Sequence, residues 1–222
     1  MKNLLILFAL LVNDTSEAKP KEFNSRVLIY KGAEEGLKSA FASSVMIKSV
    51  HADGTSMGSG NLLEYRKEHY IMTAYHVVKD SLFLVLVEKD GNTVPASVIY
   101  SDDKKDIAIL EPHGSFNSTE AIKHRKKKHD LLGTPVYHCG HPTGAYFNIS
   151  EGIITSFSVD SYIINSFSMP GSSGSVVFDK DGDIVGIVVS VGMHYSFGMP
   201  DLISNLVNVV DFDLREIKML NR

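Results

Sequence analysis

The sequence predicts an all-β protein. Short runs rich in Val, Ile, Tyr and Phe recur along the chain and are separated by Gly, Asp and Asn, a pattern typical of the strands of a barrel or sandwich. Asp-Gly pairs stand between apolar runs at residues 51–54, 89–92 and 179–182, which indicates hairpins. Of the 222 residues, 44% are hydrophobic and 22% are charged, and this ordinary globular composition argues against a disordered or fibrous protein.

The first residues resemble a secretory signal in composition. Lys2 precedes an apolar stretch over residues 4–12, and small residues follow, so we expect a signal peptide over residues 1–18 that is cleaved after Ala18. The apolar stretch is about half of the roughly 20 residues that cross a bilayer, and no later segment is long enough. We therefore expect no stable membrane span after cleavage and a secreted or periplasmic protein. The alternative to a signal peptide is a buried N-terminal strand. The alternative to a secreted or periplasmic location is a virus-encoded protein that is released in the host.

Six apolar runs are the clearest strand candidates, at residues 44–50, 70–74, 82–87, 107–110, 152–158 and 184–191. Two segments predict helices, residues 32–41 and residues 201–209, the second beginning directly behind Pro200. Cys139 is the only cysteine, so no internal disulfide can form and the fold depends on its packed core.

The stretch AIKHRKKKHD, residues 121–130, is strongly basic. A block of like charge is seldom part of a core, so we expect a solvated linker that joins a half at residues 19–120 to a half at residues 131–222. A nucleic-acid patch is the alternative, but this is a single cluster with no interleaved aromatic residues, so we expect no nucleic-acid partner.

Three residues in the order His, Asp, Ser carry the candidate chemistry. His76 follows the strand candidate at 70–74, Asp106 begins the one at 107–110, and Ser173 lies in MPGSSGSVVF, residues 169–178. A serine hydroxyl needs a base to take its proton when it attacks, and the base needs an acid that orients it. His76, Asp106 and Ser173 supply these residue types.

The glycines beside Ser173 suit acyl transfer. Gly171 permits a tight turn in which its N–H and the N–H of Ser173 converge as an oxyanion hole, and Gly174 lets the chain pass closely behind the nucleophile. A cluster of Gly and Ser alone is more often a plain loop. The three stretches together favour catalysis.

These stretches resemble trypsin-like, chymotrypsin-fold serine proteases, most closely the HtrA/Deg family and compact bacterial or viral members. The resemblance is carried, in the family's order, by GSGNLL (58–63), TAYHVV (73–78), DIAIL (106–110), GHPTG (140–144), EGIITSF (151–157), PGSSGSVVF (170–178), DGDIVGIVVS (181–190) and FGMPDLI (197–203).

The resemblance implies two six-stranded antiparallel β-barrels with a cleft between them, His76 and Asp106 in the first and Ser173 in the second. With the helix predicted at 201–209, this gives an all-β chymotrypsin-type fold with a short C-terminal helix. It implies a serine endopeptidase that acts on protein or peptide substrates through an acyl-enzyme, with His76 as base and no cofactor. A catalytically silent protein of the same fold that binds peptides or another protein is the alternative. An α/β-hydrolase does not fit, because its order is Ser, Asp, His.

Departures from the family bear on activation and on specificity. Ser172 stands where digestive zymogens have an Asp that pairs with a newly cut N-terminus, so we expect no activation by that salt bridge. Val188 stands where glutamyl endopeptidases have His, which argues against glutamate specificity. The resemblance places the wall of the specificity pocket at residues 165–169 and 188–192, where Phe167, Met169 and Val188 are apolar, so we expect a preference for small or medium apolar residues. Ser190 and Gly192 offer a strand edge for an extended peptide.

The stretch YHCGHPTG offers His138, Cys139 and His141 as metal ligands. Neighbouring side chains on a strand point to opposite faces, and zinc needs ligands in a tetrahedral array, so we expect no metal site and a buried, inert Cys139.

Overall fold

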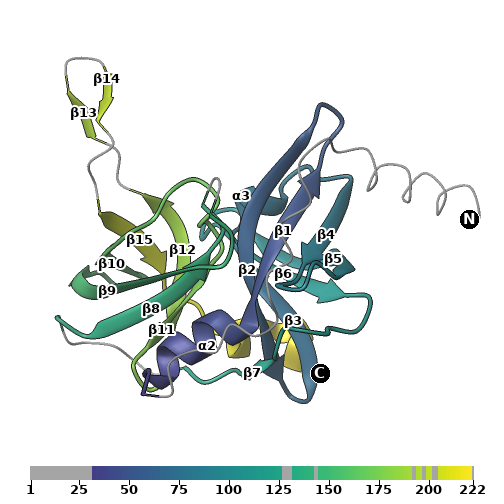
Figure 1. Cartoon of the computed structure of the whole chain (residues 1–222), viewed down its shortest axis with the longest axis horizontal. Coiled ribbons are helices and arrows are strands. Elements are labelled where there is room, and N and C mark those ends of the chain that lie inside the picture. The colour runs from purple at the N-terminus through teal and green to yellow at the C-terminus, as the bar shows by residue number, and fades with distance from the viewer. Residues whose placement is uncertain are drawn as a thin grey trace, which may run out of the picture.

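The computed structural model describes residues 32–126, 132–142, 145–191, 194–196, 199–201 and 205–221. The predicted signal peptide, the linker residues 127–130 and Gly192 lie outside the described residues. Two barrels stand side by side, as Figure 1 shows. The predicted all-β fold with two six-stranded antiparallel barrels is confirmed. None of the described helices is long and apolar enough to cross a membrane.

The first barrel has the strand order β1-β4-β5-β6-β3-β2 and is closed by pairing of β1 with β2. Its strands are β1 (Ser44–Val50), β2 (Thr55–Tyr65), β3 (Glu68–Thr73), β4 (Phe83–Val87), β5 (Thr93–Asp102) and β6 (Ile107–Pro112). A short helix α3 (Tyr75–Val78) follows β3, and β7 (Ile122–Lys123) pairs parallel with β2.

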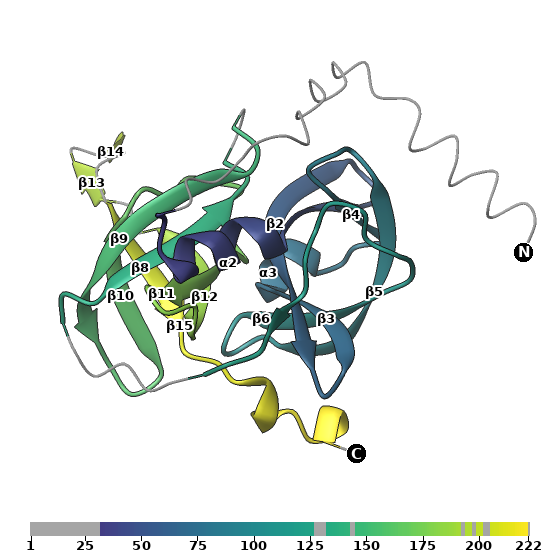
Figure 2. The same ribbon diagram turned by 60° about the horizontal axis from the view of Figure 1, so that its bottom comes forward.

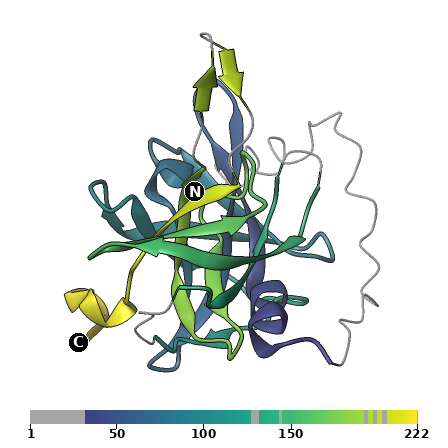
Figure 3. The same ribbon diagram turned by 90° about the vertical axis from the view of Figure 1, so that its left-hand side faces the viewer.

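The second barrel has the closed order β10-β15-β12-β11-β8-β9. Its strands are β8 (Pro135–Gly140), β9 (Asn148–Phe157), β10 (Ser161–Ser166), β11 (Val176–Asp179), β12 (Ile184–Val191) and β15 (Leu206–Val210). A hairpin of β13 (His194–Ser196) and β14 (Met199–Asp201) projects from this barrel, as Figures 1 and 3 show.

The helix predicted over residues 201–209 is wrong. Strand β15 occupies residues 206–210 and closes the second barrel, with Val207 and Val209 in the barrel core. The β-branched valines favour a strand, and this preference outweighs the helix start signal at Pro200. The C-terminal helical turns come later, as 3₁₀ turns at Leu214–Glu216 and Lys218–Asn221.

The strands at 44–50 and 184–191 have the predicted bounds, and α2 (Glu35–Ser43) overlaps the helix predicted at 32–41. The three Asp-Gly segments join β1 to β2, β4 to β5 and β11 to β12, so the predicted hairpins are confirmed.

The strands that face both the barrel interior and the space between the barrels are apolar on both faces. In β6, Ala108 and Leu110 pack in the interior of the first barrel, whereas Ile107 and Ile109 pack in a core shared by both barrels. In β12, Val185 and Val188 likewise face the interior of the second barrel. The continuous apolar runs of the sequence follow from this double burial.

Each end of the described chain packs on the other barrel. Helix α2 precedes the first barrel but contacts the second, where the N–H of Gly36 donates to the carbonyl of Lys180 at 3.1 Å. After β15 the chain returns beneath the first barrel, as Figure 2 shows. There the ring of Phe212 stacks on that of Tyr100, with 6.3 Å between centroids.

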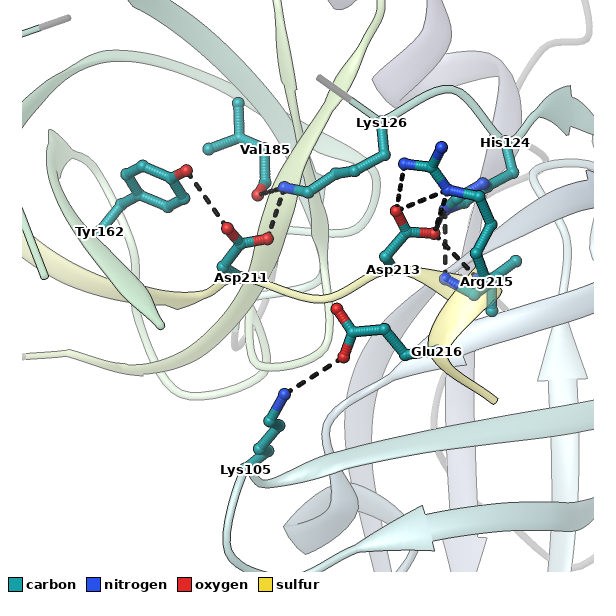
Figure 4. Close-up of polar contacts among 10 residues, drawn as sticks. Lys105, His124, Lys126, Tyr162, Val185, Asp211, Asp213, Arg215 and Glu216 are labelled. Carbon is teal, nitrogen blue, oxygen red and sulfur yellow. Dashed lines mark hydrogen bonds and ion pairs between the residues drawn. The ribbon is translucent and has the colours of Figure 1, made fainter. Parts of the chain in front are cut away.

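The basic segment is not a simple solvated linker, and this expectation is wrong for His124 and Lys126. The Lys126 side chain is 7% exposed, and its ammonium lies 2.7 Å from the Asp211 carboxylate, donates to the carbonyl of Val185 and faces the ring of Tyr162. Burial lowers the pKa of Lys126, and Asp211 acts in the opposite direction. Figure 4 shows that these contacts join the linker to the C-terminal segment.

His124 makes the second contact of this group. Its Nε2 accepts a hydrogen bond from the backbone N–H of Leu214 at 3.3 Å and lies 3.6 Å from Asp213, which Figure 4 also shows. Burial lowers the pKa of His124. The neutral ring therefore acts as an acceptor for the C-terminal segment.

Lys126→Ala should lower the free energy of unfolding by about 2 to 3 kcal/mol, because removing one partner of a buried ion pair leaves the other charge uncompensated. Urea denaturation followed by circular dichroism measures this. Lys180→Ala is the matched control, since Lys180 and Asp181 form an ion pair at 2.8 Å on the surface. The control should leave stability unchanged within error. Equal effects of the two substitutions would contradict the assignment of Lys126 as a buried structural contact.

Candidate active site

His76 and Asp106 form a closely bonded pair in the first barrel. Asp106 Oδ2 lies 2.7 Å from His76 Nδ1, and Asp106 Oδ1 accepts the backbone N–H of His76 at 2.8 Å. The carbonyl of Asp106 also accepts the N–H of Tyr75 at 3.1 Å. Asp106 therefore fixes both the His76 ring and the first turn of α3.

The backbone of Asp106 has a φ of +55°, in the left-handed region that Asp tolerates better than most residues. The His76 side chain is 46% exposed and that of Asp106 is 29% exposed. The imidazole is thus held firmly at Nδ1, while much of the ring is open to solvent.

Ser173 lies in the loop between β10 and β11, in the second barrel. Gly171 and Gly174 have φ angles of +102° and +91°, which favour glycine. A Cβ at Gly174 would overlap the Ser59 carbonyl oxygen and the Thr73 hydroxyl, and would lie 3.1 Å from the backbone nitrogen of Ala74. The loop therefore packs against the segment that leads into His76.

No hydrogen bond joins the Ser173 hydroxyl to the His76 ring among the residues that the structure describes. The loop that carries Ser173 instead contacts residues close to His76 and in the neighbouring strand β2. Ala74, which Gly174 approaches, stands two residues before His76, and the carbonyl of Ser173 accepts the N–H of Ser59 at 2.8 Å.

The N–H groups of the loop differ in whether they have an acceptor among the described residues. The N–H groups of Ser172, Gly174 and Ser175 donate to the carbonyls of Met169, Val188 and Ser172, at 2.9, 2.7 and 3.1 Å. Across the described part of the chain, the N–H groups of Gly171 and Ser173 have no acceptor. These are the two amides that the sequence predicts for an oxyanion hole.

The predicted pocket residues differ in what they expose. Phe167 is 51% exposed and lines an open pocket of about 390 Å³ between β9 and β10, together with Glu151, Ile153, Asn165 and others. Met169 is half-buried, and Ser190 is exposed and accepts a hydrogen bond from Asn208 at 2.9 Å.

Val188 does not expose its side chain to a substrate. It is 1% exposed in the core of the second barrel, because β12 turns this face inward. Its backbone contacts the nucleophile loop instead: its carbonyl accepts the N–H of Gly174, and its N–H donates to Ser175 at 2.9 Å.

His138, Cys139 and His141 are buried, and Ser44 contacts both the carbonyl of Cys139, at 3.2 Å, and the ring of His141. His138 Nε2 lies 3.1 Å from the Ser166 hydroxyl, and His141 Nε2 lies 3.2 Å from the Ser44 hydroxyl. Burial lowers the pKa of His138 to about 4 and that of His141 to about 3, and raises the pKa of the Cys139 thiol to about 12. Cys139 is the buried thiol that the sequence predicts. No cluster of metal-ligating side chains occurs among the described residues.

Sequence reasoning does not single out Ser59, although it contacts the nucleophile loop by both its backbone and its hydroxyl. It lies in GSGNLL, where the only local signal is a serine between two glycines. A Cβ at Gly58 or Gly60 would press on Val77 or Ile71, so the glycines indicate close packing rather than chemistry.

The model of the trypsin-like peptidase domain matches residues 58–187, which include His76, Asp106 and Ser173. The chain belongs to the family of trypsin-like peptidases. The chain is similar to a probable periplasmic serine endoprotease, DegP-like, of Pseudomonas fulva. The two are 29% identical over 143 residues, and the match covers 61% of this chain and 29% of that protein. The chain is also similar to an HtrA-like serine protease of Staphylococcus aureus. The two are 24% identical over 206 residues, and the match covers 81% of this chain and 26% of that protein.

The chain thus spans less than a third of the length of these two curated relatives. Among solved structures, a serine endoprotease from Yersinia pestis has the same fold, with a TM-score of 0.63 and 19% identity over 86% of this chain and 63% of that one.

Gly174→Ala should destabilise the protein by about 2 kcal/mol or more, because it adds a clash with backbone atoms to the cost of a positive φ. Gly91→Ala is the matched control, since Gly91 has a φ of +85° and open space around its Cβ position. Urea denaturation of both variants separates the clash from the φ cost. Equal losses would show that the barrels do not meet closely at Gly174.

Proposed function

We propose that the chain is a serine endopeptidase that cleaves protein or peptide substrates, with Ser173 as nucleophile, His76 as general base and Asp106 as the residue that orients His76. The observation that carries the proposal is the 2.7 Å hydrogen bond between His76 Nδ1 and Asp106 Oδ2. A proton held at Nδ1 leaves Nε2 unprotonated, so Nε2 is the atom that can take a proton from a hydroxyl.

In the proposed reaction, Ser173 Oγ attacks the carbonyl carbon of the scissile bond, and its proton passes to His76 Nε2. The oxyanion of the tetrahedral intermediate accepts hydrogen bonds from the N–H groups of Gly171 and Ser173. The intermediate collapses, the C–N bond breaks, and the leaving amine takes the proton from His76. A water molecule then hydrolyses the acyl-enzyme ester by the same steps. Neither N–H group has an acceptor among the described residues, which supports this role.

We further propose that the substrate lies along the end of β12, at Ser190 and Val191, and that an apolar side chain before the scissile bond contacts Phe167 and Met169. The exposure of Phe167 supports this. We also propose action in the periplasm or outside the cell, which is supported by the predicted signal peptide and by the description of the Pseudomonas fulva relative as periplasmic.

A fluorophosphonate probe should label the protein at Ser173, with the site read by peptide mass spectrometry, and Ser173→Ala should abolish labelling. Asp106→Asn should slow labelling by about 10³- to 10⁴-fold, because the tautomer of His76 is then wrong. Labelling that persists in Ser173→Ala would remove Ser173 from its role. If the natural chain is not labelled, the silent, peptide-binding alternative is favoured.

Profiling with a peptide library should give cleavage after small or medium apolar residues. Val, Ala, Leu or Met before the scissile bond would agree with the exposed Phe167. A dominant preference for Lys or Arg would contradict this and would point to Glu151, a carboxylate among the residues that line the pocket. Glu151→Gln tests that outcome directly, since the substitution keeps the shape of the side chain and removes its charge.

A further inference from the structure

Ser59, in β2 of the first barrel, holds the backbone of the nucleophile loop of the second barrel from two sides. Its hydroxyl donates to the carbonyl of Gly171 at 2.7 Å, and its backbone N–H donates to the carbonyl of Ser173 at 2.8 Å. Ser59 is fully buried. It therefore contacts Gly171 and Ser173, the two residues whose N–H groups have no acceptor in the described part of the chain, and it contacts each of them through the carbonyl.

The bonds of Ser59 fix two peptide planes. In the plane between Gly171 and Ser172, Ser59 holds the carbonyl and Met169 accepts the N–H. In the plane between Ser173 and Gly174, Ser59 holds the carbonyl and Val188 accepts the N–H. A trans peptide is planar, so a plane bonded at both its carbonyl and its N–H cannot rotate freely.

The plane between these two is fixed by Ser175. Its hydroxyl and its N–H donate to the carbonyl of Ser172 at 2.7 and 3.1 Å. Because the C=O and N–H of a trans peptide point in opposite directions, the N–H of Ser173 is directed away from Ser175. The peptide planes before and after the one that carries the Ser173 N–H therefore cannot rotate freely. This N–H has no acceptor among the described residues.

The hydroxyl of Ser59 has one proton, and its direction is determined. The backbone N–H of His141 donates to Ser59 Oγ at 3.0 Å, so the oxygen acts there as an acceptor and its proton goes to Gly171. The carbonyl of Ser59 accepts the hydroxyl of Thr73 at 2.7 Å. Thr73 ends β3 and stands three residues before His76, so the same residue is tied to the segment of the base.

We propose that Ser59 is a positioning residue for the reaction: it holds the backbone from Gly171 to Ser173 so that the two free N–H groups face the oxyanion. Ser59 does not touch the substrate and acts through the loop. This inference rests on the proposed function, because it presupposes that Ser173 is the nucleophile. Its effect should fall on the transition state and not on binding of the substrate.

Ser59→Ala removes the hydroxyl and keeps the backbone bond to Ser173. We expect kcat to fall about 10- to 100-fold with little change in KM, since small displacements of catalytic groups have effects of this size. The rate constant of fluorophosphonate labelling should fall by a similar factor. A peptide boronic acid, whose tetrahedral adduct uses the oxyanion hole, should bind more weakly by that factor, while the matching peptide carboxamide should bind equally well.

Ser43→Ala is the matched control. Ser43 is a buried serine in α2. Its hydroxyl donates to the carbonyl of Ser39 at 2.7 Å and accepts a hydrogen bond from the side-chain amide of Asn61 at 2.8 Å, and among the described residues it has no hydrogen bond of its own to the nucleophile loop. It should lower thermal stability and leave kcat and the labelling rate unchanged. Ser59→Cys, which nearly keeps the volume but donates weakly, serves if Ser59→Ala does not fold.

The outcomes separate this inference from the proposed function. If the natural chain is not labelled at Ser173, the proposed function fails. If the natural chain is labelled and Ser59→Ala and Ser59→Cys keep its kcat and labelling rate, Ser59 is merely structural and the inference is overturned. An increase in KM with unchanged kcat would overturn it as well.

Discussion

The two barrels meet backbone to backbone at Gly174, and the arrangement of the candidate site depends on this contact. Because Gly174 has no side chain, the loop that carries Ser173 lies directly on Ser59, within β2, and on Thr73, at the end of β3, both in the first barrel. Side chains can adjust by changing rotamer, but two main chains in contact cannot. The spacing between the loop and the segment of His76 is therefore set by the main chain.

Around this contact, buried polar groups support exposed reacting groups. His76 is half exposed, whereas Ser59, Thr73 and His141 are buried and hydrogen-bonded. The ring of His141 accepts the N–H of Phe147 at 3.1 Å through Nδ1, and burial lowers its pKa to about 3. His141, whose backbone N–H donates to Ser59 Oγ, therefore keeps a neutral ring across the pH range in which a free histidine titrates.

Local patterns predict what depends on local properties. The strands at 44–50 and 184–191 and the Asp-Gly hairpins are found because periodicity and turn residues determine them. Strand β15 is missed because Pro200 and Asp201 give a helix start signal, while partners on β10 and β12 decide the outcome. The burial of Lys126 is missed because its partner, Asp211, is distant in the sequence.

The candidate site shows the same division. Residue type and order are sufficient to propose His76, Asp106 and Ser173. Ser59 has an ordinary hydroxyl whose importance comes from partners in the other barrel, at Gly171 and Ser173. A single sequence does not contain this information, because the pairing of a serine with a distant carbonyl leaves no local pattern.

The packing of residues 212–220 against the shared core has a consequence for biosynthesis. Residues 212–220, which are made after the strands of both barrels, supply Phe212, Leu214, Ile217 and Leu220 to the core that the barrels share. The first barrel, complete in its strands by residue 112, keeps this surface uncovered while about a hundred further residues are made. The shared core therefore cannot be completed before residues 212–220 have been made, and the exposed apolar surface must be kept from aggregation until then.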